Sequence, residues 1–580
     1  MEISFESGEK LFFEKKYDKA VEIFEKLLEK EPENYLIISR LALIYQIKKE
    51  YDKAVKFYLK SLKINPKQVE IYNNLGCIYR EINRFDKAIE FFKKDLSSYE
   101  NLFNLGILFE KIGKIKEARK CYYNAIKLKI EKRFSLQTKI AFLLPPIYSS
   151  SNEILKVRRR IEDYINRHIS SEEKIDNPID DIGITNFYLG YHGMCNKDIN
   201  VMIANFYRKN INSSFFKSFN KKPNNKKIKI GFVSSFFRKH SVSDVSNLWI
   251  SQLNKKIFNT VIFSIGSFND NSIKILKNNC NRFYSLPANI EIIQDAILSE
   301  SLDILFFTDI GMDAVTYFLS FSRLAPIQVT YTGHPDTTGV DTIDYYISSD
   351  FWEINEAEKH YSEKLVKFHS LTWYYKKPEI SDGLKKEKID FGFSDKDNIY
   401  CINQSLFKIH PDFDAIIDKI LEMDKNGKVV LFFNREFFWW KDFLVERFKN
   451  SIKNFNRVIF LPKLSFSLYL NFLSISNIIL DTIYFNGGTT SLQAFAVGAP
   501  IVTMPDRLMR SRFTLGMYEK MGIDDLVSKS IDDYVEKAVK VANDKSINLE
   551  LRKKIFKNNK CLYEDSEVIE EFENFFKNLI

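Results

Sequence analysis

The sequence lacks long hydrophobic runs. Its longest apolar stretches, such as Ile140–Leu144 and Val429–Phe433, fall far short of the roughly 18 residues that a membrane-spanning helix needs. The chain begins MEISFESGEK, with acidic residues where a secretory signal peptide has a basic start and an apolar segment. We therefore predict no membrane span and expect the protein in the cytoplasm.

Cysteine is scarce and widely spaced. The six cysteines lie at least 44 residues apart, so no Cys-x-x-Cys metal clip or dense disulfide frame can be drawn. We interpret all of them as reduced core residues: Cys77, Cys121, Cys195, Cys280, Cys401 and Cys561. A strong excess of one charge is also missing, because 86 Lys and Arg against 76 Asp and Glu give a net charge of only +10, spread along the chain. Nucleic acid is therefore not an expected partner.

A repeat of 34 residues occupies the N-terminal part of the chain. The tetrapeptides that begin at Tyr17, Tyr51 and Phe85 each read aromatic-Asp-Lys-Ala. Small residues and prolines keep the same spacing, at Gly8, Ala42 and Gly76 and at Pro32 and Pro66. This is the tetratricopeptide period, in which a small residue lets two helices approach and proline ends the second helix. We predict such repeats over 1–130, binding a peptide or partner protein; a capping or dimer contact is the alternative.

Irregular helical patterns follow over 131–227, which we interpret as a helical connecting region that ends in the polar linker Asn220–Lys227. Beyond it, apolar strands alternate with helices in two consecutive sets, which predicts two doubly wound α/β domains at 228–385 and 386–580. The predicted strands are Ile228–Val233, Thr260–Ser264, Ile304–Thr308, Gln328–Tyr331 and Tyr345–Ser348, then Ile399–Asn403, Val429–Asn434, Arg457–Leu461, Ile478–Asp481 and Ile501–Met504. We expect the ligand in the cleft between the two domains.

The segment Leu480–Gln493 predicts an anion-binding turn. It reads as a strand end, a Gly487-Gly488 turn, and the hydroxyl residues Thr489, Thr490 and Ser491 before an amphipathic helix. The hydroxyl groups are expected to cap the helix, while the glycines let backbone N–H groups approach a phosphate. An ordinary capped helix after a tight turn is the alternative.

Other polar residues follow predicted strands and are candidates for the cleft. Lys408 comes soon after the first strand of the second set, where a lysine can hold a leaving diphosphate as a point charge. His240 follows the first strand of the first set and suits proton transfer near neutrality. Asp309 and His334 also follow strands, and each is alternatively a hydrogen-bonding loop residue. Arg512, after the last strand, is a candidate for the phosphates or for packing.

Several segments together resemble the O-GlcNAc transferase/SPINDLY family, inverting GT-B glycosyltransferases that follow tetratricopeptide repeats. The resemblance runs from Ser7 to about Gly522, and its order is more specific than any single motif. The matching segments are Ile230–Ser235 with His240, Ala325–Thr330, Thr337–Gly339, Ile343–Tyr345, Asn403-Gln404 with Lys408, Asp481-Thr482 to Thr490, and Pro500–Pro505.

The resemblance implies roles for individual residues. Lys408, helped by Gln404, matches the lysine that stabilises the departing diphosphate, and Thr489 with Thr490 matches the phosphate cradle. Tyr469 falls where a residue stacks on the base. Gln493 stands where animal members have an acidic residue that binds the ribose, and Gly488 replaces a histidine of those members.

On the acceptor side, the resemblance makes His240 a candidate base, with Asp309 near the position of a second histidine that this chain lacks. His334, Pro335 and Thr338 are acceptor-side candidates. No cofactor is expected beyond a nucleotide-sugar co-substrate. No metal is expected either, and we interpret the pair Asp395 and Asp397 as a solvated turn.

The resemblance implies transfer of a sugar, GlcNAc from UDP-GlcNAc in the first instance, to Ser or Thr hydroxyls of a protein held by the repeats. The alternatives are an asparagine-directed glucosyltransferase, a GDP-fucose-type transferase, and a peptide-binding scaffold whose transferase half has decayed.

Overall fold

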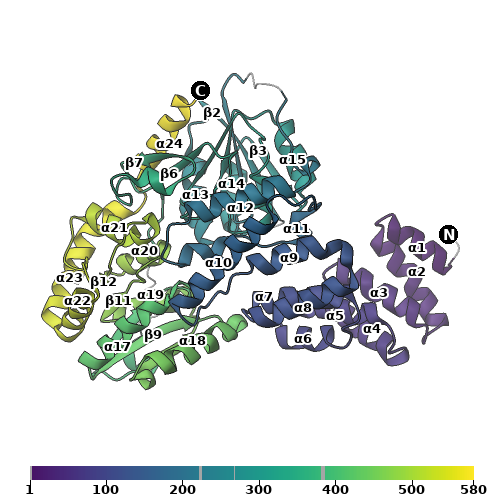
Figure 1. The fold of residues 1–580 in the computed structure, drawn as a ribbon, viewed down its shortest axis with the longest axis horizontal. Coiled ribbons are helices and arrows are strands. Elements are labelled where there is room, and N and C mark those ends of the chain that lie inside the picture. The colour runs from purple at the N-terminus through teal and green to yellow at the C-terminus, as the bar shows by residue number, and fades with distance from the viewer. Residues whose placement is uncertain (1–2, 221–224, 267, 269, 380–385) are drawn as a thin grey trace. The chain divides into compact units, whose positions relative to one another are not determined.

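The computed structural model describes residues 3–220, 225–266, 268, 270–379 and 386–580. Residues 221–224 of the predicted linker, and 380–385 before the predicted boundary at 386, lie outside the described residues. The chain divides into two compact units, Met1–Ile140 and Ala141–Ile580. Figure 1 shows helices alone in the first and sheets covered by helices in the second.

The first unit is built from helix hairpins with the predicted period. Its helices are α1 (Phe5–Phe13), α2 (Tyr17–Lys30), α3 (Tyr35–Ile47), α4 (Tyr51–Ile64), α5 (Val69–Glu81), α6 (Phe85–Phe92), α7 (Tyr99–Lys111) and α8 (Ile115–Leu128). The repeated tetrapeptides begin α2, α4 and α6. A Cβ added at Gly76 would overlap the Phe92 ring, and Gly106 stands in the same way against Tyr122. The small residues are therefore required because an aromatic ring fills the space between the paired helices.

The predicted connecting region is helical. It contains α9 (Arg133–Phe142), α10 (Ser151–His168), α11 (Pro178–Asp181) and α12 (Lys197–Asn210). The buried Arg158 guanidinium of α10 donates to Asn196 Oδ1 (2.7 Å), and Asn196 Nδ2 donates in turn to Asp336 Oδ2 (2.5 Å). This region is thus joined by buried polar contacts to the α/β part that follows.

Among the described residues, the first sheet has seven parallel strands in the order β3-β2-β1-β4-β5-β6-β7. They are β1 (Ile228–Ser234), β2 (Phe258–Ile265), β3 (Arg282–Leu286), β4 (Ile304–Phe307), β5 (Ile327–Tyr331), β6 (Tyr345–Ser349) and β7 (Lys364–Phe368), with α13 (Ser241–Gln252), α14 (Asn271–Asn279), α15 (Ile290–Ser299) and α16 (Ala314–Leu319) between them. All five predicted strands are present. The sequence prediction missed β3 and β7, the two edge strands.

The second sheet is also parallel, with five strands within the described ranges in the order β10-β9-β8-β11-β12. They are β8 (Asn398–Ile402), β9 (Gly427–Phe433), β10 (Val458–Pro462), β11 (Ile478–Leu480) and β12 (Ile501–Val502). The helices are α17 (Asp414–Met423), α18 (Phe438–Ser451), α19 (Phe466–Ile475), α20 (Thr489–Ala496), α21 (Phe513–Met521), α22 (Ile531–Asn543), α23 (Lys545–Asn558) and α24 (Glu567–Asn578). These five strands are the five predicted ones.

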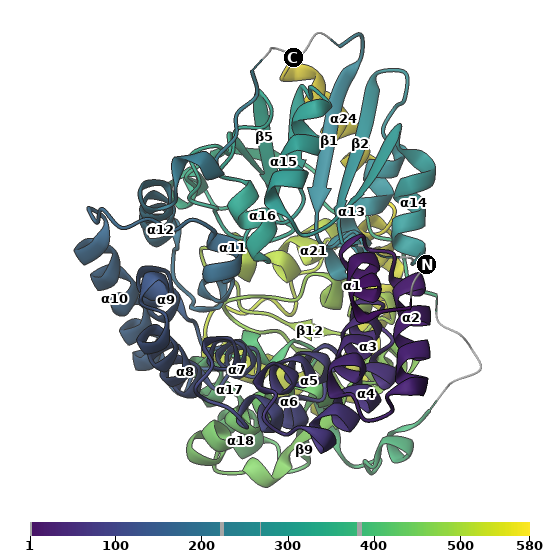
Figure 2. The same cartoon turned by 90° about the vertical axis from the view of Figure 1, so that its right-hand side faces the viewer.

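The last helix returns to the first sheet. The α24 ring of Phe572 stacks on Trp249 of α13, with ring centroids 3.8 Å apart, and Phe576 lies 6.0 Å from Phe306 of β4. Figures 1 and 2 show this helix, in yellow, beside the teal strands of that sheet. The predicted second α/β domain, 386–580, thus includes a helix, α24, that packs on the first sheet.

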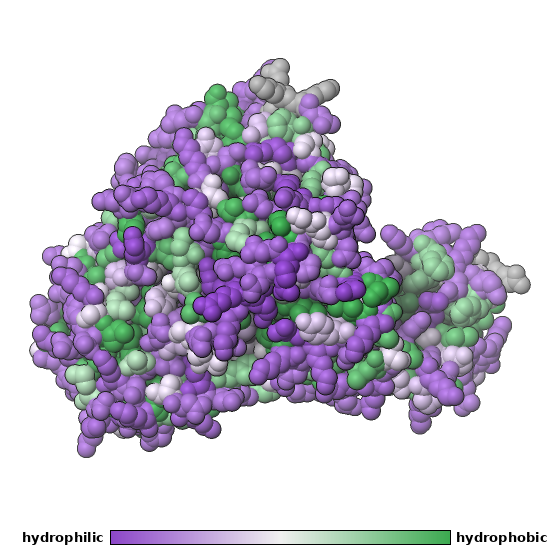
Figure 3. Space-filling model, viewed as in Figure 1, coloured by the Kyte–Doolittle hydropathy of each residue, from purple (hydrophilic) through white to green (hydrophobic). Residues whose placement is uncertain are grey.

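The surface of the protein is mostly hydrophilic, and its cysteines differ in exposure. In the described parts of the chain, no helix is both long and apolar enough to span a membrane. Hydrophilic side chains cover most of the face drawn in Figure 3. All six cysteines are free; Cys121 and Cys401 are buried, but Cys195 is exposed, so the prediction that every cysteine is a core residue is wrong.

Candidate active site

A large cleft lies at the carboxyl ends of the strands of the second sheet. Its volume is about 1100 Å³, and both α/β parts of the chain line it. One wall comes from α13 and α14, and the other from the loops after β8, β9 and β10 and from the start of α20. Polar and aromatic lining residues include Lys239, Asp244, Tyr375, Gln404, Phe407, Trp440, Lys463, Tyr469, Thr489, Thr490 and Gln493. This is the position in which parallel sheets bind their ligands.

A chain of hydrogen bonds runs from Lys408 to the start of α20. Lys408 Nζ donates to Gln404 Oε1 (3.0 Å), and Gln404 Nε2 donates to Thr490 Oγ1 (2.9 Å). Lys408 ends a short 3-10 helix that follows β8, while α20 follows β11. Because β8 and β11 are neighbouring parallel strands, their carboxyl ends bring the two segments together. The sequence prediction had named all three residues.

The Lys408 ammonium is enclosed by protein. It also donates to the carbonyl oxygen of Asn486 (3.0 Å) and lies 4.5 Å from the centroid of the Phe485 ring. Burial lowers the pKa of Lys408 to about 8, and the nearby Asp481 carboxylate opposes this shift. Lys408 itself is not a lining residue of the cleft, but Gln404, to which it donates, is one. Two of the three ammonium protons have protein acceptors, and no described residue accepts the third.

The start of α20 differs from the predicted capped helix. The cap position is Gly488, and no side chain makes a capping hydrogen bond. The Ser491 hydroxyl is instead paired with that of Thr514 (2.9 Å), and the Thr490 hydroxyl accepts from Gln404. The prediction of hydroxyl capping is therefore wrong. Thr489 and Thr490 line the cleft in a first turn whose N–H groups no described side chain caps, which favours an anion there.

Other residues that line the cleft are suited to contacts with a nucleoside. Tyr469 of α19 lines the cleft and packs edge-on against Phe432, with centroids 5.7 Å apart. Gln493 lies one turn along α20 from Thr490, and its Nε2 donates to the Tyr375 hydroxyl (3.1 Å). Tyr375 follows the last strand of the first sheet, so a side chain from each α/β part meets there.

Comparison with protein families gives this geometry a context. The family model for glycosyl transferase family 41 matches residues 193–377 and 381–568. Models for tetratricopeptide repeats match residues 33–101 and 99–129. The chain belongs to glycosyl transferase family 41. Tetratricopeptide repeats therefore precede a family 41 region of two parallel-sheet parts.

Similar curated proteins include two kinds of transferase. The chain is 26% identical to the UDP-glucose:protein N-beta-glucosyltransferase of Actinobacillus pleuropneumoniae serotype 5b over 281 residues, which is 47% of this chain and 44% of that protein. It is 29% identical over 239 residues to the probable UDP-N-acetylglucosamine–peptide N-acetylglucosaminyltransferase SPINDLY of Hordeum vulgare, covering 40% of this chain and 25% of that protein. The chain thus spans less than half the length of these relatives.

A solved structure shares the fold along nearly the whole chain. It is that of a mutant of the Thermobaculum terrenum O-GlcNAc transferase, with a TM-score of 0.66 and 17% identity. The match covers 94% of this chain and 97% of that one.

One residue outside the sequence prediction fills space next to the start of α20. The indole of Trp373 would lie 3.0 Å from a Cβ added at Gly488. This ring is buried, donates from Nε1 to the Thr332 hydroxyl (2.8 Å), and packs against Trp352 and Phe513. Glycine at 488 is therefore matched to a tryptophan that occupies the room a larger side chain needs.

The two predicted proton-transfer residues lie outside the lining of the cleft. His240 caps α13, since its Nδ1 accepts from the Val242 N–H (3.2 Å), and burial lowers its pKa to about 4. Asp309 is fully buried and accepts hydrogen bonds from Ser234 and Thr308, with burial raising its pKa. His240 caps the start of α13 and is not a lining residue of the cleft, although Lys239 and Ser241 on either side of it are.

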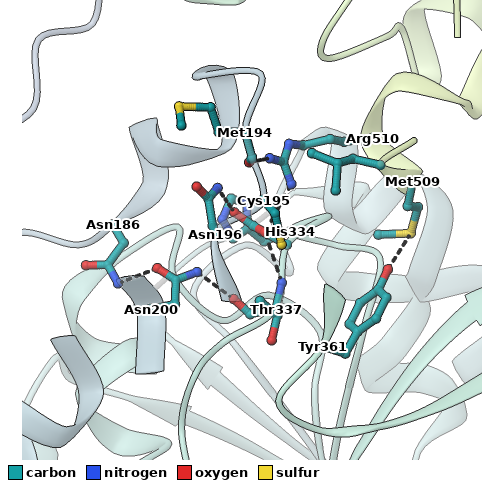
Figure 4. Close-up of polar contacts among 12 residues, drawn as sticks. Asn186, Met194, Cys195, Asn196, Asn200, His334, Thr337, Tyr361, Met509 and Arg510 are labelled. Carbon is teal, nitrogen blue, oxygen red and sulfur yellow. Dashed lines mark hydrogen bonds and ion pairs between the residues drawn. The ribbon is translucent and has the colours of Figure 1, made fainter. Parts of the chain in front are cut away.

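The acceptor-side candidates are packed inside the first α/β part. His334 is buried, which lowers its pKa to about 4, and the Thr338 hydroxyl donates to Glu363. Pro335 borders a void of only about 10 Å³. Figure 4 shows polar contacts around His334 and Thr337, including the hydrogen bond from Arg510 to the carbonyl oxygen of Met194 (2.5 Å). None of the three candidates lines the large cleft.

Arg512 and the Asp-x-Asp pair also lie away from the cleft lining. Arg512 Nε donates to the carbonyl oxygen of Trp352 (2.9 Å), which is a packing contact. Asp397 accepts from the N–H of Ser394 (2.7 Å), as in a closed turn. Across the described residues, no group of three or more His, Cys, Asp or Glu side chains is placed to hold a metal ion.

Proposed function

We propose that this protein is an inverting glycosyltransferase that moves a sugar from a UDP-sugar, GlcNAc in the first instance, to Ser or Thr hydroxyls of protein acceptors. The observation that carries the proposal is the hydrogen-bonded chain of Lys408, Gln404 and Thr490 at the uncapped start of α20. The similarity to a UDP-glucose:protein glucosyltransferase and to a probable UDP-N-acetylglucosamine–peptide transferase supports UDP as the nucleotide and a protein or peptide as the acceptor.

The chemistry follows from the charge that must be stabilised. The acceptor hydroxyl oxygen forms a bond to the anomeric carbon, and its proton passes to water or to the leaving diphosphate. The bond from that carbon to the β-phosphate oxygen breaks, and its electron pair leaves with the diphosphate. The third Lys408 proton and the first N–H groups of α20 are suited to receive this charge. A single donor of this kind contributes about 3–4 kcal/mol to the barrier, or roughly 100- to 1,000-fold in rate.

Lys408 also bears on the need for a metal. A fixed ammonium beside the leaving group supplies the positive charge that Mg²⁺ supplies in many phosphate-transfer enzymes. We therefore expect transfer to continue in EDTA. Loss of transfer in EDTA with recovery on adding Mg²⁺ or Mn²⁺ would contradict this part of the proposal.

The acceptor assignment rests on the repeats. Tetratricopeptide stacks present a concave surface that binds extended peptides, so we propose that the first unit selects the protein to be modified. Removing repeats should then reduce transfer to the protein acceptor more than hydrolysis of the donor.

A second candidate function is glucose transfer to asparagine, favoured by the similarity to the N-beta-glucosyltransferase. The two are separated by incubating the protein with radiolabelled UDP-GlcNAc, UDP-glucose and GDP-fucose and a lysate, then identifying the labelled residue by mass spectrometry. Label from UDP-GlcNAc on Ser or Thr supports the first candidate, and glucose on Asn supports the second. If no UDP or GDP compound raises the melting temperature and no label is transferred, the chain is a binding scaffold and the proposal fails.

A further inference from the structure

A carboxylate without a protein partner faces the cleft from the first α/β part. Asp244 lies in the first turn of α13, and its side chain lines the cleft and is exposed to it. No described residue forms a hydrogen bond or ion pair with its carboxylate oxygens. The other cleft-lining carboxylate, Glu379, lies at the rim and is paired with Lys376 (3.9 Å).

Asp244 stands beside the Tyr375–Gln493 pair. The N–H of Tyr374 donates to the carbonyl oxygen of Val245 (3.3 Å), which holds the Tyr375 segment against the first turn of α13. Burial raises the pKa of the Tyr375 hydroxyl to about 12, and the charge of Asp244 acts in the same direction, so the two groups are within electrostatic reach. Enclosure by the cleft walls likewise raises the pKa of Asp244 to about 6, against the effect of Lys239.

The positions of the candidate phosphate-binding residues indicate which part of a bound nucleotide Asp244 would contact. Lys408, Gln404 and Thr490 mark the diphosphate end. Gln493 is three residues after Thr490 and so lies next to it on the same face of α20, about 5–6 Å away. In a nucleoside diphosphate, the group that follows the phosphates is the ribose, and its 2′- and 3′-hydroxyls are two adjacent hydrogen-bond donors.

We propose that Asp244 accepts hydrogen bonds from the 2′- and 3′-hydroxyls of the donor's ribose, and that the Tyr375–Gln493 pair contacts the same sugar from the opposite side. A carboxylate matches a diol because it offers two acceptor oxygens and no donor, and acidic residues bind ribose hydroxyls in other nucleotide sites. This inference rests on the proposed function, because it needs a nucleotide in the cleft. The ribose would then join the two α/β parts, since α13 belongs to the first and α20 to the second.

Calorimetric titration of the full chain with UDP, 2′-deoxy-UDP and 3′-deoxy-UDP tests this without any variant. Because a hydrogen bond to a charged group contributes roughly 10- to 100-fold in affinity, each deoxy compound should bind about 10- to 100-fold more weakly than UDP. Equal affinity for all three compounds would overturn the proposal.

Variants then assign the effect to Asp244. Asp244→Asn should weaken UDP binding at least about tenfold while changing the affinity for 2′,3′-dideoxy-UDP, which lacks both hydroxyls, by less than about threefold. Glu379→Gln is the matched control, since it neutralises a cleft carboxylate that is already paired, and it should bind UDP like the wild type. Circular dichroism melts establish that each variant is folded; if Asp244→Asn does not fold, the deoxynucleotide comparison still decides.

The possible failures are distinguishable. If the wild type binds no nucleotide at all, the proposed function fails as well. If it binds UDP and Asp244→Asn keeps both the affinity and the preference for UDP over the deoxy compounds, only the ribose role fails. If Asp244→Asn keeps that preference but loses transfer to the acceptor, the carboxylate serves the acceptor, and the ribose role is equally refuted.

Discussion

Binding of a diphosphate should draw a proton onto Lys408. Burial lowers the pKa of the free side chain from 10.5 to about 8. A bound diphosphate places negative charge beside the ammonium and raises this pKa again, so the complex holds a full proton where the free protein does not. At pH 8.5 a group with a pKa of about 8 is roughly one-quarter protonated, so UDP binding should take up about three-quarters of a proton. For the same reason, the affinity should fall as the pH rises above 8, by up to about tenfold per pH unit.

Titration calorimetry of UDP binding at pH 8.5, in buffers with different ionisation enthalpies, measures this proton uptake. Lys408→Met should abolish the uptake and weaken binding, whereas Lys376→Met, which removes an exposed lysine at the rim of the same cleft, should keep it. At pH 6.5 the wild type should take up almost no proton at this site, because Lys408 is already charged. Wild-type binding without proton uptake at pH 8.5, or equal uptake by Lys408→Met, would refute the assignment of Lys408 to the diphosphate.

Three glycine substitutions give further expectations. Gly487→Ala places a Cβ against the hydroxyl side chains beside it, so UDP affinity measured by calorimetry should fall at least about tenfold with the fold retained. Gly488→His should lower the free energy of unfolding by about 1–3 kcal/mol in urea titrations because the Trp373 ring cannot move aside, and adding Trp373→Phe should recover part of the loss. Gly76→Val should lower the helical circular dichroism melting temperature of the repeats because the Phe92 ring fills the space, and an unchanged melt would refute that packing.

The sequence predicted the strands that are mostly buried, and it missed two strands whose residues are mostly exposed or half-buried. The ten predicted strands include the central ones of both sheets, which are buried on both faces and read as apolar runs. The two missed strands, Arg282–Leu286 and Lys364–Phe368, are edge strands whose residues are largely exposed or half-buried. With Arg, Lys and Ser inside them, they carry no continuous apolar signal. Their strand conformation is decided by the neighbour that pairs with them.

The candidate site was predictable where a residue follows its own strand closely. Gln404 and Lys408 lie in the segment that follows β8, and Thr490 lies at the start of the helix that follows β11, so the pairing of these two strands brings them together. Asp244 and Tyr375 gave no such signal, because the cleft position of each depends on how two distant segments pack. For His240 the prediction chose a catalytic role where the sequence also allowed a capping role. His240 stands just before a helix and forms a capping box with Ser243.

The helix that carries Asp244, α13, packs against the last helix, α24. Trp249, on the same helix as Asp244, stacks at 3.8 Å on Phe572 of α24. One carboxylate of α24, Glu571, accepts from the N–H groups of His369 (2.7 Å) and Ser370 (3.0 Å), at the start of the segment that continues to Tyr375. Both elements proposed to contact the ribose from the first α/β part are therefore fixed to a helix that comes after the second in the sequence. The geometry of the donor site thus depends on residues about 200 positions beyond the Tyr375 segment and more than 300 positions beyond Asp244.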